Sequence, residues 1–461
     1  MNAPYPGVHR LRPLAAAASA LFLAGCATFS ADGGLNDVSS MTAARVGQPV
    51  QFTKDEKPAR PQSVETRQAV SRLLAEPLSP ESAVQVALLN NPGLRTSLSE
   101  LGVAEADLVQ AGQMRNPGFT FGRMRDGADV EIERSIGFDV IGLLTIPLRR
   151  GIEAQRFEQA KAQAAAEAVR IAAQTRRAWF NAVAAAQTVE YMEQVGSAAE
   201  ASAELARRMA AVGNWSRLDH AREQVFYAEA TAQIARARHH ARASREQLAR
   251  MMGLWGDQLD FRLPNRLPDL PQAPRGIEDF ERIAMEQRLD LQMARRDAEA
   301  TARALGLSRR TGFINVLHAE LANVSETGGH RARGYEIELA LPIFDWGQAR
   351  NARAEAIYMG AVHRTADVAV RARSEVREAY SAYRTSYDLA RHYRDEVVPL
   401  RRLISEEMVL RYNGMLVGVF ELLADARVQV AAVNSAIEAQ RDYWLAQSDL
   451  HMALHGTGGA A

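Results

Sequence analysis

The residues that could carry chemistry are few in this sequence, and none of them forms a catalytic pattern. His239 and His240 lie in the charged segment RARHHARASR, which is typical of a solvated helix face more than of a metal site. His220 and Glu223 stand three residues apart on a predicted helix, a spacing that puts two ligands on one face but that arises often by chance. The sequence has no His-Glu-x-x-His pattern, phosphate-binding loop or nucleotide-binding glycine pattern. We therefore expect no enzyme activity, no cofactor and no metal site.

The single cysteine, Cys26, ends an N-terminal segment with the layout of an export signal. Arg10 and Arg12 precede an apolar stretch that ends in the sequence LAGC. The segment resembles a bacterial lipoprotein signal, which implies removal of residues 1–25 and acylation of Cys26, for example with palmitate. Ala27, in place of an aspartate, favours sorting to the outer membrane. The alternative is an ordinary signal peptide or a short buried helix. Acylation would consume the thiol, so a nucleophilic cysteine is not expected.

Composition favours long helices and gives no sign of nucleic-acid binding. Lys plus Arg and Asp plus Glu are equal at 55 each, so the chain has no general basic footprint. Aromatic residues make up only 7% of the chain, while Ala, Arg, Glu and Gln are abundant. No run of about 18 apolar residues follows Cys26, so strands would have to provide any membrane crossing.

Four segments alternate like strands and have nearly the length that a tilted strand needs to cross a bilayer. They are residues 116–124, 133–148, 311–324 and 333–344, which pair as hairpins at about 116–148 and 311–344. In the last segment Tyr335, Ile337 and Leu339 alternate with Glu336 and Glu338. If the apolar side faces lipid, the two glutamates line a pore and favour cations. The alternative is that they only solvate a polar face.

The hairpins belong to two halves of related layout. Each half has two short helical pieces, a hairpin and a long helical pair with the three- and four-residue steps of a coiled coil. About 60 residues of such a helix would reach roughly 90 Å. Residues 26–77, punctuated by proline and glycine, are expected to be an extended, lipidated tether. The first half is expected at 78–275, with its long pair at about 151–252, and the second at 276–461, with its pair at about 348–455.

An isolated two-stranded hairpin cannot remain alone in lipid, because each unpaired backbone group there costs several kcal/mol. Several copies would have to pool their hairpins into one closed β-barrel, with the long helices packed beneath it.

The chain resembles TolC-like outer-membrane efflux proteins, of the lipoprotein branch, over about residues 78–455. The resemblance rests on the doubled order of elements and on three phrases, NNPGL (90–94), LPIFDWGQAR (341–350) and ELLADARVQV (421–430). It implies a mainly α fold with a membrane part: four strands per subunit in a trimeric twelve-stranded barrel, continued by a tunnel of long antiparallel helices. It also implies a lipid-anchored homotrimer in the outer membrane that exports solutes with a periplasmic adaptor protein and an inner-membrane pump.

By the same resemblance, the turns at 212–219 and 412–423 form the periplasmic tip that meets the adaptor. The candidate contact residues are Gly213, Ser216, Asp219, Tyr412, Asn413, Gly414 and Asp425. The second turn departs from the frequent Tyr-x-x-Gly form, which puts an acidic gate ring there in doubt. Asp219 is the better acidic candidate, although an Asp at a helix start more often only stabilises the first turn.

A different class of protein also fits part of the pattern. A periplasmic coiled-coil lipoprotein that acts as an adaptor or scaffold explains the long helices and the anchor, but not four strands of membrane-spanning length. The cargo stays open between a metal ion, such as copper, and organic compounds.

Overall fold

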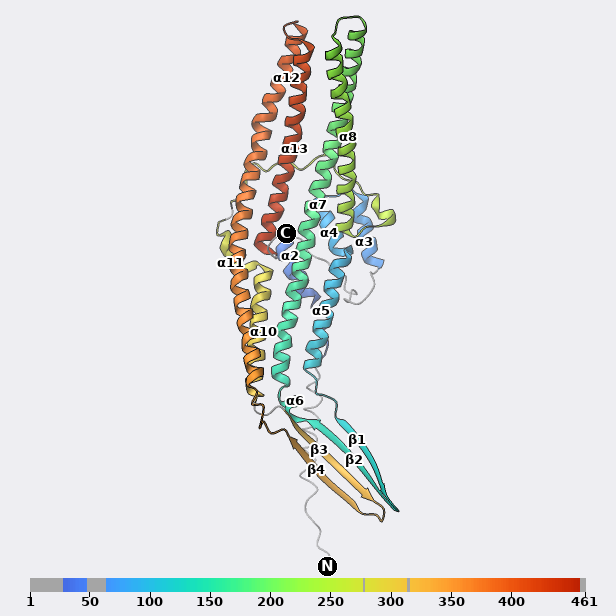
Figure 1. The fold of residues 1–461 in the computed structure, drawn as a ribbon, viewed down its shortest axis with the longest axis vertical. Helices are drawn as coiled ribbons and strands as arrows, with labels where there is room; N and C mark the ends of the chain where they lie inside the picture. Colours follow the sequence, from blue (N-terminus) through green and yellow to red (C-terminus); the bar gives the residue numbers. More distant parts are fainter. Residues whose placement is uncertain (1–27, 48–63, 277, 313–315, 457–461) are drawn as a thin grey trace, which may run out of the picture.

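The protein is long and narrow, with its strands at one end and the turns of two helical hairpins at the other (Figure 1). The computed structural model describes residues 28–47, 64–276, 278–312 and 316–456. Cys26 therefore lies outside the described residues, as does most of the segment that precedes residue 64. None of the described helices contains a stretch that is long and apolar enough to cross a membrane.

Two antiparallel pairs of long helices form the part with the tips, and in each pair the return helix ends near the middle of the molecule (Figure 1). The first pair is α7 (Ile146–Ala211) and α8 (Arg217–Met252). The second is α11 (Gln348–His392), a π-helical turn (Tyr393–Val397), α12 (Val398–Asn413) and the return helix α13 (Val419–His455). At 1.5 Å per residue, α7 reaches about 100 Å. The π-helical turn ends just before Pro399, whose missing N–H disrupts regular α-helical bonding at this point.

Small side chains let other helices pack closely on the middle of α7. Its buried face is dominated by alanines, among them Ala165, Ala168 and Ala172. Trp179 is the largest side chain buried on this face, and its indole N–H donates to the carbonyl of Leu78 at 2.9 Å. Helices α4 (Pro80–Asn90), α5 (Pro92–Ala111) and α10 (Leu289–Arg310) all pack on α7, and α9 (Phe280–Gln287) packs on α11 and α13.

The expectation of an extended tether is wrong for two segments. Residues Leu35–Val46 form α2, and Val64–Ala75 form α3. Leu35, Val38 and Val46 are buried against α7, and Val70 is buried beside α4. Their three- and four-residue spacing supplies one apolar stripe on an otherwise polar helix, which is enough for a helix that packs on a larger neighbour.

The two halves share a backbone bend that different side chains stabilise. Between α4 and α5, Asn91 has φ −67° and ψ 123°, and its side chain accepts hydrogen bonds from the N–H groups of Gly93 and Leu94. Between α9 and α10, Arg288 has φ −62° and ψ 129°. Its buried guanidinium binds Asp290 at 2.6 Å and Glu375 at 2.8 Å.

The phrase NNPGL also closes the far end of α8. The Asn90 amide donates to the carbonyl oxygens of Met252 and Gly253, and the Asn91 amide donates to that of Met251. Gly253 has φ 68°, and a Cβ there would lie 2.7 Å from the carbonyl oxygen of Asn90. The motif therefore stabilises the packing of α4 and α5 against the end of α8.

The linker between the halves is fixed by tyrosines of the second half. It starts after α8 with a short 3₁₀ turn (Gly256–Leu259). The hydroxyl of Tyr387 donates to the carbonyl oxygens of Pro271 and Gln272, and that of Tyr383 accepts from the N–H of Arg275. Both rings are buried against Tyr443 of α13.

One antiparallel sheet contains the described strands, in the order β1-β2-β3-β4. They are β1 (Gly118–Asp126), β2 (Asp129–Asp139), β3 (Leu317–Glu326) and β4 (Arg331–Leu339). The expected fold class, mainly helical with four strands and long antiparallel helices, is confirmed. The two hairpins lie beside each other because β2 pairs with β3 across the duplication.

Both hairpins end earlier than the sequence predicts. Residues 140–148 are not strand, because the Asp139 carboxylate accepts from the N–H of Gly142 and starts the short helix α6 (Val140–Leu144). Pro147 then lies in the first turn of α7, where its missing N–H costs nothing. In the second hairpin, residues 340–344 are likewise outside the strand. There Asp345 accepts from the N–H of Gly347, which has φ 77° and precedes α11.

A half-buried pair of histidines lies near the end of α13. The rings of His451 and His455 lie 4.8 Å apart. Burial lowers the pKa of His451 to about 3, helped by the positive charges of His455 and Arg176. Burial also lowers the pKa of His455 to about 4, with Arg45 adding to the effect.

We expect acid to destabilise the protein through this pair. In the unfolded chain both pKa values return to about 6.5, so below that pH the unfolded state binds more protons and stability falls. The loss should reach about 1–2 kcal/mol per histidine by pH 5. Thermal unfolding between pH 7.5 and 5.0 measures it, and His451→Leu should flatten the curve whereas His239→Leu should not. An unchanged slope in His451→Leu would contradict this assignment.

Candidate functional site

The register of the sheet separates acidic side chains from apolar ones. Glu336 pairs with Glu320, and Glu338 pairs with His318, so these side chains share one side of the sheet. The register of β2 and β1 places the remaining carboxylates of the strands on that same side. This surface, the acidic face, contains Asp126, Asp129, Glu131, Glu133, Asp139, Glu320, Glu326, Glu336 and Glu338.

Sequence reasoning found only two residues of the acidic face. Glu320 lies over Gly137, where a Cβ would be 3.8 Å from its carboxylate. Glu133 lies over Gly122, where the corresponding distance is 3.6 Å. The period-two alternation in DVEIERSIGF and HAELANVSE carries the same signal as YEIEL and could have identified both glutamates. The directly opposed Glu320 and Glu336 repel each other, which favours an aqueous face where water and counterions screen them.

The opposite side of the sheet, the apolar face, is exposed in the single subunit. It carries Phe119, Phe121, Val130, Ile132, Ile136, Phe138, Leu317, Ala319, Leu321, Tyr335, Ile337 and Leu339. Tyr335 is 77% exposed, Phe119 67% and Leu321 63%. A contiguous apolar surface of this size on a sheet marks a contact with lipid or with another protein.

Aromatic residues also mark the junction between β4 and α11. Phe344 is 99% exposed and Trp346 57%. Both side chains therefore offer apolar surface at the point where the sheet meets the helices.

The first tip turn joins α7 to α8 with a tight cap. Gly213 has φ 78°, and the N–H of Asn214 donates back to the carbonyl of Met209 at 3.0 Å. The Ser216 hydroxyl accepts from the N–H of Asp219 and donates to its carboxylate at 2.6 Å. The carboxylate of Asp219 therefore takes part in capping α8.

The second tip turn repeats this geometry with a different residue at the critical position. The N–H of Leu416 donates to the carbonyl of Arg411 at 2.9 Å, and Met415 has φ 58°. Gly414 is not left-handed, with φ −80°. Tyr412 and Asn413 are exposed at the end of α12. Asp425 lies apart from the turn, partly buried inside α13.

An ion pair near the tips, missed by sequence reasoning, joins the two helical pairs. Arg427 of α13 lies 3.1 Å from Glu223 of α8, whose side chain is only 2% exposed. The Ser202 hydroxyl of α7 donates to the other oxygen of Glu223 at 2.8 Å, and the guanidinium of Arg427 lies over the ring of Phe226. Because the partners are far apart in sequence, only the three-residue spacing of His220 and Glu223 could be recognised from the sequence. Within the described residues, these two side chains belong to no group that could hold a metal ion.

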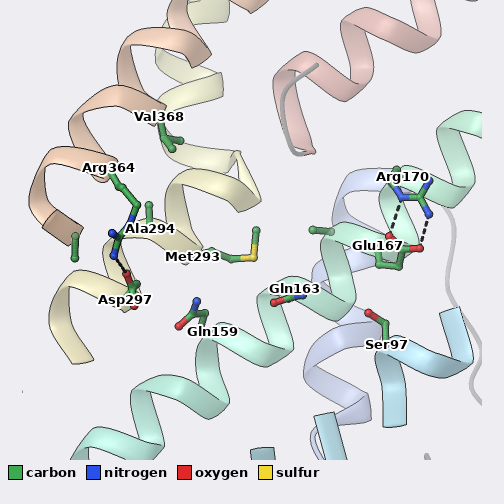
Figure 2. Close-up of a pocket in the computed structure, with 12 residues that line it drawn as sticks. Ser97, Gln159, Gln163, Glu167, Arg170, Met293, Ala294, Asp297, Arg364 and Val368 are labelled. Atoms are coloured by element: carbon green, nitrogen blue, oxygen red, sulfur yellow. Dashed lines mark hydrogen bonds and ion pairs between the residues drawn. The ribbon is translucent and has the colours of Figure 1, made fainter. Parts of the chain in front are cut away.

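A surface groove between α7 and the α10–α11 pair shows paired charges and no catalytic arrangement (Figure 2). Arg170 binds Glu167 on one side, and Arg364 binds Asp297 at 2.9 Å on the other. Gln159, Gln163 and Met293 lie between these pairs. Within the described residues, no group of three or more His, Cys, Asp or Glu side chains could hold a metal ion.

Comparison with known proteins bears on the fold. No family model matches the chain. The cobalt-zinc-cadmium resistance protein CzcC of Cupriavidus metallidurans is 25% identical over 294 residues, which cover 60% of this chain and 66% of that protein. The chain thus aligns with slightly less than two thirds of that relative's length.

Solved structures of outer-membrane proteins share the fold at lower sequence identity. CusC, described as forming a transmembrane channel, is 15% identical with a TM-score of 0.68, covering 88% of this chain and 99% of its own. The CmeC outer membrane channel of Campylobacter jejuni is 16% identical with a TM-score of 0.71, covering 82% and 86%. VceC of Vibrio cholerae is 15% identical with a TM-score of 0.69, covering 82% and 96%. The fold that the resemblance to TolC-like outer-membrane efflux proteins implies is confirmed, since the chain shares the fold of these outer-membrane proteins.

We expect the ion pair between Glu223 and Arg427 to hold the two tips together. Arg427→Met would leave the buried Glu223 without its cation, which should weaken local stability by about 2–3 kcal/mol. Hydrogen exchange of the amides at residues 419–430 measures this as faster opening. Arg222→Met, which removes the exposed partner of Asp219, is the control and should change little. Adding Glu223→Gln should restore part of the protection, and failure of Arg427→Met to speed exchange would contradict the role.

Proposed function

We propose that this chain, which has the fold of outer-membrane channels, is the outer-membrane channel subunit of a tripartite efflux system. The observation that carries the proposal is one four-stranded sheet with an apolar face and an acidic face, continuous with helices about 100 Å long. An adaptor or scaffold would need the long helices, but it gives no reason for a sheet with these two faces. Like the channels it resembles, the protein would act by passage and not by catalysis.

A closed assembly follows from the free edges of the sheet. β1 and β4 each pair on one side only, so their outer backbone groups have no partner in the sheet. In lipid these groups must pair, and four strands are too few to close on themselves. Three copies would give a twelve-stranded barrel. Exposed apolar residues along α11 and α12, such as Val370, Leu400 and Leu403, would then be covered by neighbouring subunits.

The acidic face would line the pore and favour cations. Glu320, Glu336 and Glu338 would repeat in each subunit, and carboxylate rings attract cations. The name of CzcC associates that relative with cobalt, zinc and cadmium. Divalent metal ions are therefore the cargo that the charge of this face favours, over neutral or anionic organic compounds.

The helical tips would contact the adaptor through apolar side chains at the turns. Val212 is 71% exposed, Leu218 60%, Met415 93% and Leu416 78%. Val212, Gly213 and Leu218 form one small apolar surface, and Met415 and Leu416 form a similar one, both at the end of the subunit farthest from the sheet (Figure 1).

A lipid on Cys26 fits the start of the described chain. The backbone N–H of Ser30 donates to Glu105 of α5 at 2.6 Å, and its hydroxyl donates to the same oxygen. Glu105 lies near the end of α5 that leads into β1. Four residues of extended chain reach about 14 Å, which would place an acylated Cys26 close to the membrane surface at the foot of the sheet.

Planar bilayer conductance of the purified protein tests the channel. We expect discrete channel events that select for cations, with the reversal potential shifted toward zero in the triple variant Glu320→Gln, Glu336→Gln and Glu338→Gln. The same substitutions at three exposed glutamates, Glu65 of α3, Glu76 just after α3 and Glu100 of α5, are the matched control. Deleting residues 311–344 should abolish the events.

If no conductance is seen, the interpretation depends on whether the protein is a folded trimer or a soluble monomer. A folded trimer without conductance would be measured again with Arg427→Met, which should loosen the tips. A monomer that remains soluble without detergent after removal of its acyl chains would contradict the channel and favour the scaffold.

A further inference from the structure

The arginines of the sheet are sorted as strictly as its carboxylates. The strands contain Arg123, Arg125, Arg134, Arg331 and Arg333, and the register places all five on the apolar face. Every Asp and Glu of the strands lies on the other side. A sheet that used charge only for solubility would mix both signs on its exposed surfaces.

The five arginines also lie together near the hairpin turns, in three successive rows that we call the basic level. Nearest the helices, the apolar face carries rows of apolar residues, the last being Phe119, Ile136, Leu321 and Tyr335. The next row contains Arg134 and Arg333 beside Phe121 and Asn323, and the one after it contains Arg123 and Arg331 beside Ile132 and Ser325. Arg125 follows, at the turn. Rows are about 7 Å apart, so the change from apolar to basic takes place within one or two rows.

Within the part of the chain that the structure describes, these guanidinium groups bind no carboxylate. All five residues are exposed, and within the described residues none of them takes part in an ion pair. Arg125 donates to the backbone oxygen of Gly127 at 3.1 Å. Since the carboxylates face the other way, the basic level is open to an external anion.

We propose that this basic level binds the headgroup phosphates of anionic lipid in the outer leaflet of the membrane. The inference rests on the proposed function, because it needs the apolar rows to lie in the hydrocarbon and the hairpin turns to lie outside it. Guanidinium groups bind phosphate in pairs of parallel hydrogen bonds, and their stems pack on apolar surface while the charged end reaches the interface. Tyr335, in the last apolar row, has the position of an interfacial aromatic. Asn323 adds an amide donor between the arginines of the first basic row.

A lipid with phosphates fits better than a soluble anion. The basic level adjoins a continuous apolar surface, so one ligand can use both only if it has acyl chains and a charged head. In three copies the level would form a belt around the barrel, which matches a ring of surrounding lipids.

The test is thermal unfolding of the detergent-solubilised trimer with added lipid A, a lipid that carries phosphates. We expect lipid A to raise the midpoint of the wild type, and lipid A without phosphates to raise it far less. In the triple variant Arg134→Gln, Arg331→Gln and Arg333→Gln, the apparent affinity for lipid A should fall on the order of tenfold or more. Each basic residue near an anionic surface contributes about a factor of five in affinity. The same substitutions at the exposed Arg373, Arg391 and Arg411 of the helices are the control and should keep the wild-type response.

Other outcomes separate this inference from the channel itself. Equal stabilisation of the strand variant and the wild type would overturn the phosphate site, even if both conduct normally. Stabilisation by inorganic phosphate alone would overturn the lipid as its source. A wild type that neither inserts nor conducts would refute the proposed function instead. If the triple variant does not fold, Arg331→Gln and Arg333→Gln are measured singly, and each should lower the response.

Discussion

The unpaired edges of one four-stranded sheet set the main constraint on this protein. Backbone groups on the outer sides of β1 and β4 need partners, and an exposed apolar face needs either lipid or protein against it. Neither need can be met within the subunit. The same constraint explains why β2 and β3 pair across the duplication, because that pairing already removes two edges by joining the hairpins of both halves. The two edges that remain, on β1 and β4, are the ones that the proposed barrel would pair.

The helical body fixes the position and direction of the sheet. Each hairpin follows a short helix, α5 or α10, that packs on a long helix, and each leads into the long helix of its own half. The bends at Asn91 and Arg288 set the direction of α5 and α10, while Trp179, Tyr383 and Tyr387 tie the linkers to the same region. The direction of the sheet thus depends on contacts in the middle of the molecule, which lies far from the strands (Figure 1).

Local patterns in the sequence predict most of the strands and long helices. They do not predict the contacts between residues that are far apart in the sequence. Alternation in YEIEL and the helical spacing after Gln348 were enough to place a strand and a long helix, because each period reflects one buried face. The early helix starts at Val140 and Ile146 were missed, since an apolar run such as VIGLL fits either element until the cap at Asp139 is known. The ion pair of Glu223 with Arg427 was missed for a stronger reason. Nothing local in either helix indicates that the two meet.

The corresponding positions of the two halves show that backbone geometry, more than side-chain identity, is what the duplication retains. The bend before α5 uses an asparagine cap, while the same φ and ψ before α10 rely on a buried arginine with two carboxylates. At the tips, Gly213 takes the left-handed conformation at no cost, whereas Met415 takes it against a steric penalty of about 1 kcal/mol. The left-handed backbone at Met415 directs into solvent a side chain that is 93% exposed, at the turn proposed to contact the adaptor. The strain is offset within the subunit, because the left-handed Met415 lets the N–H of Leu416 close the end of α12 on the carbonyl of Arg411, as Gly213 and Asn214 close α7 on Met209.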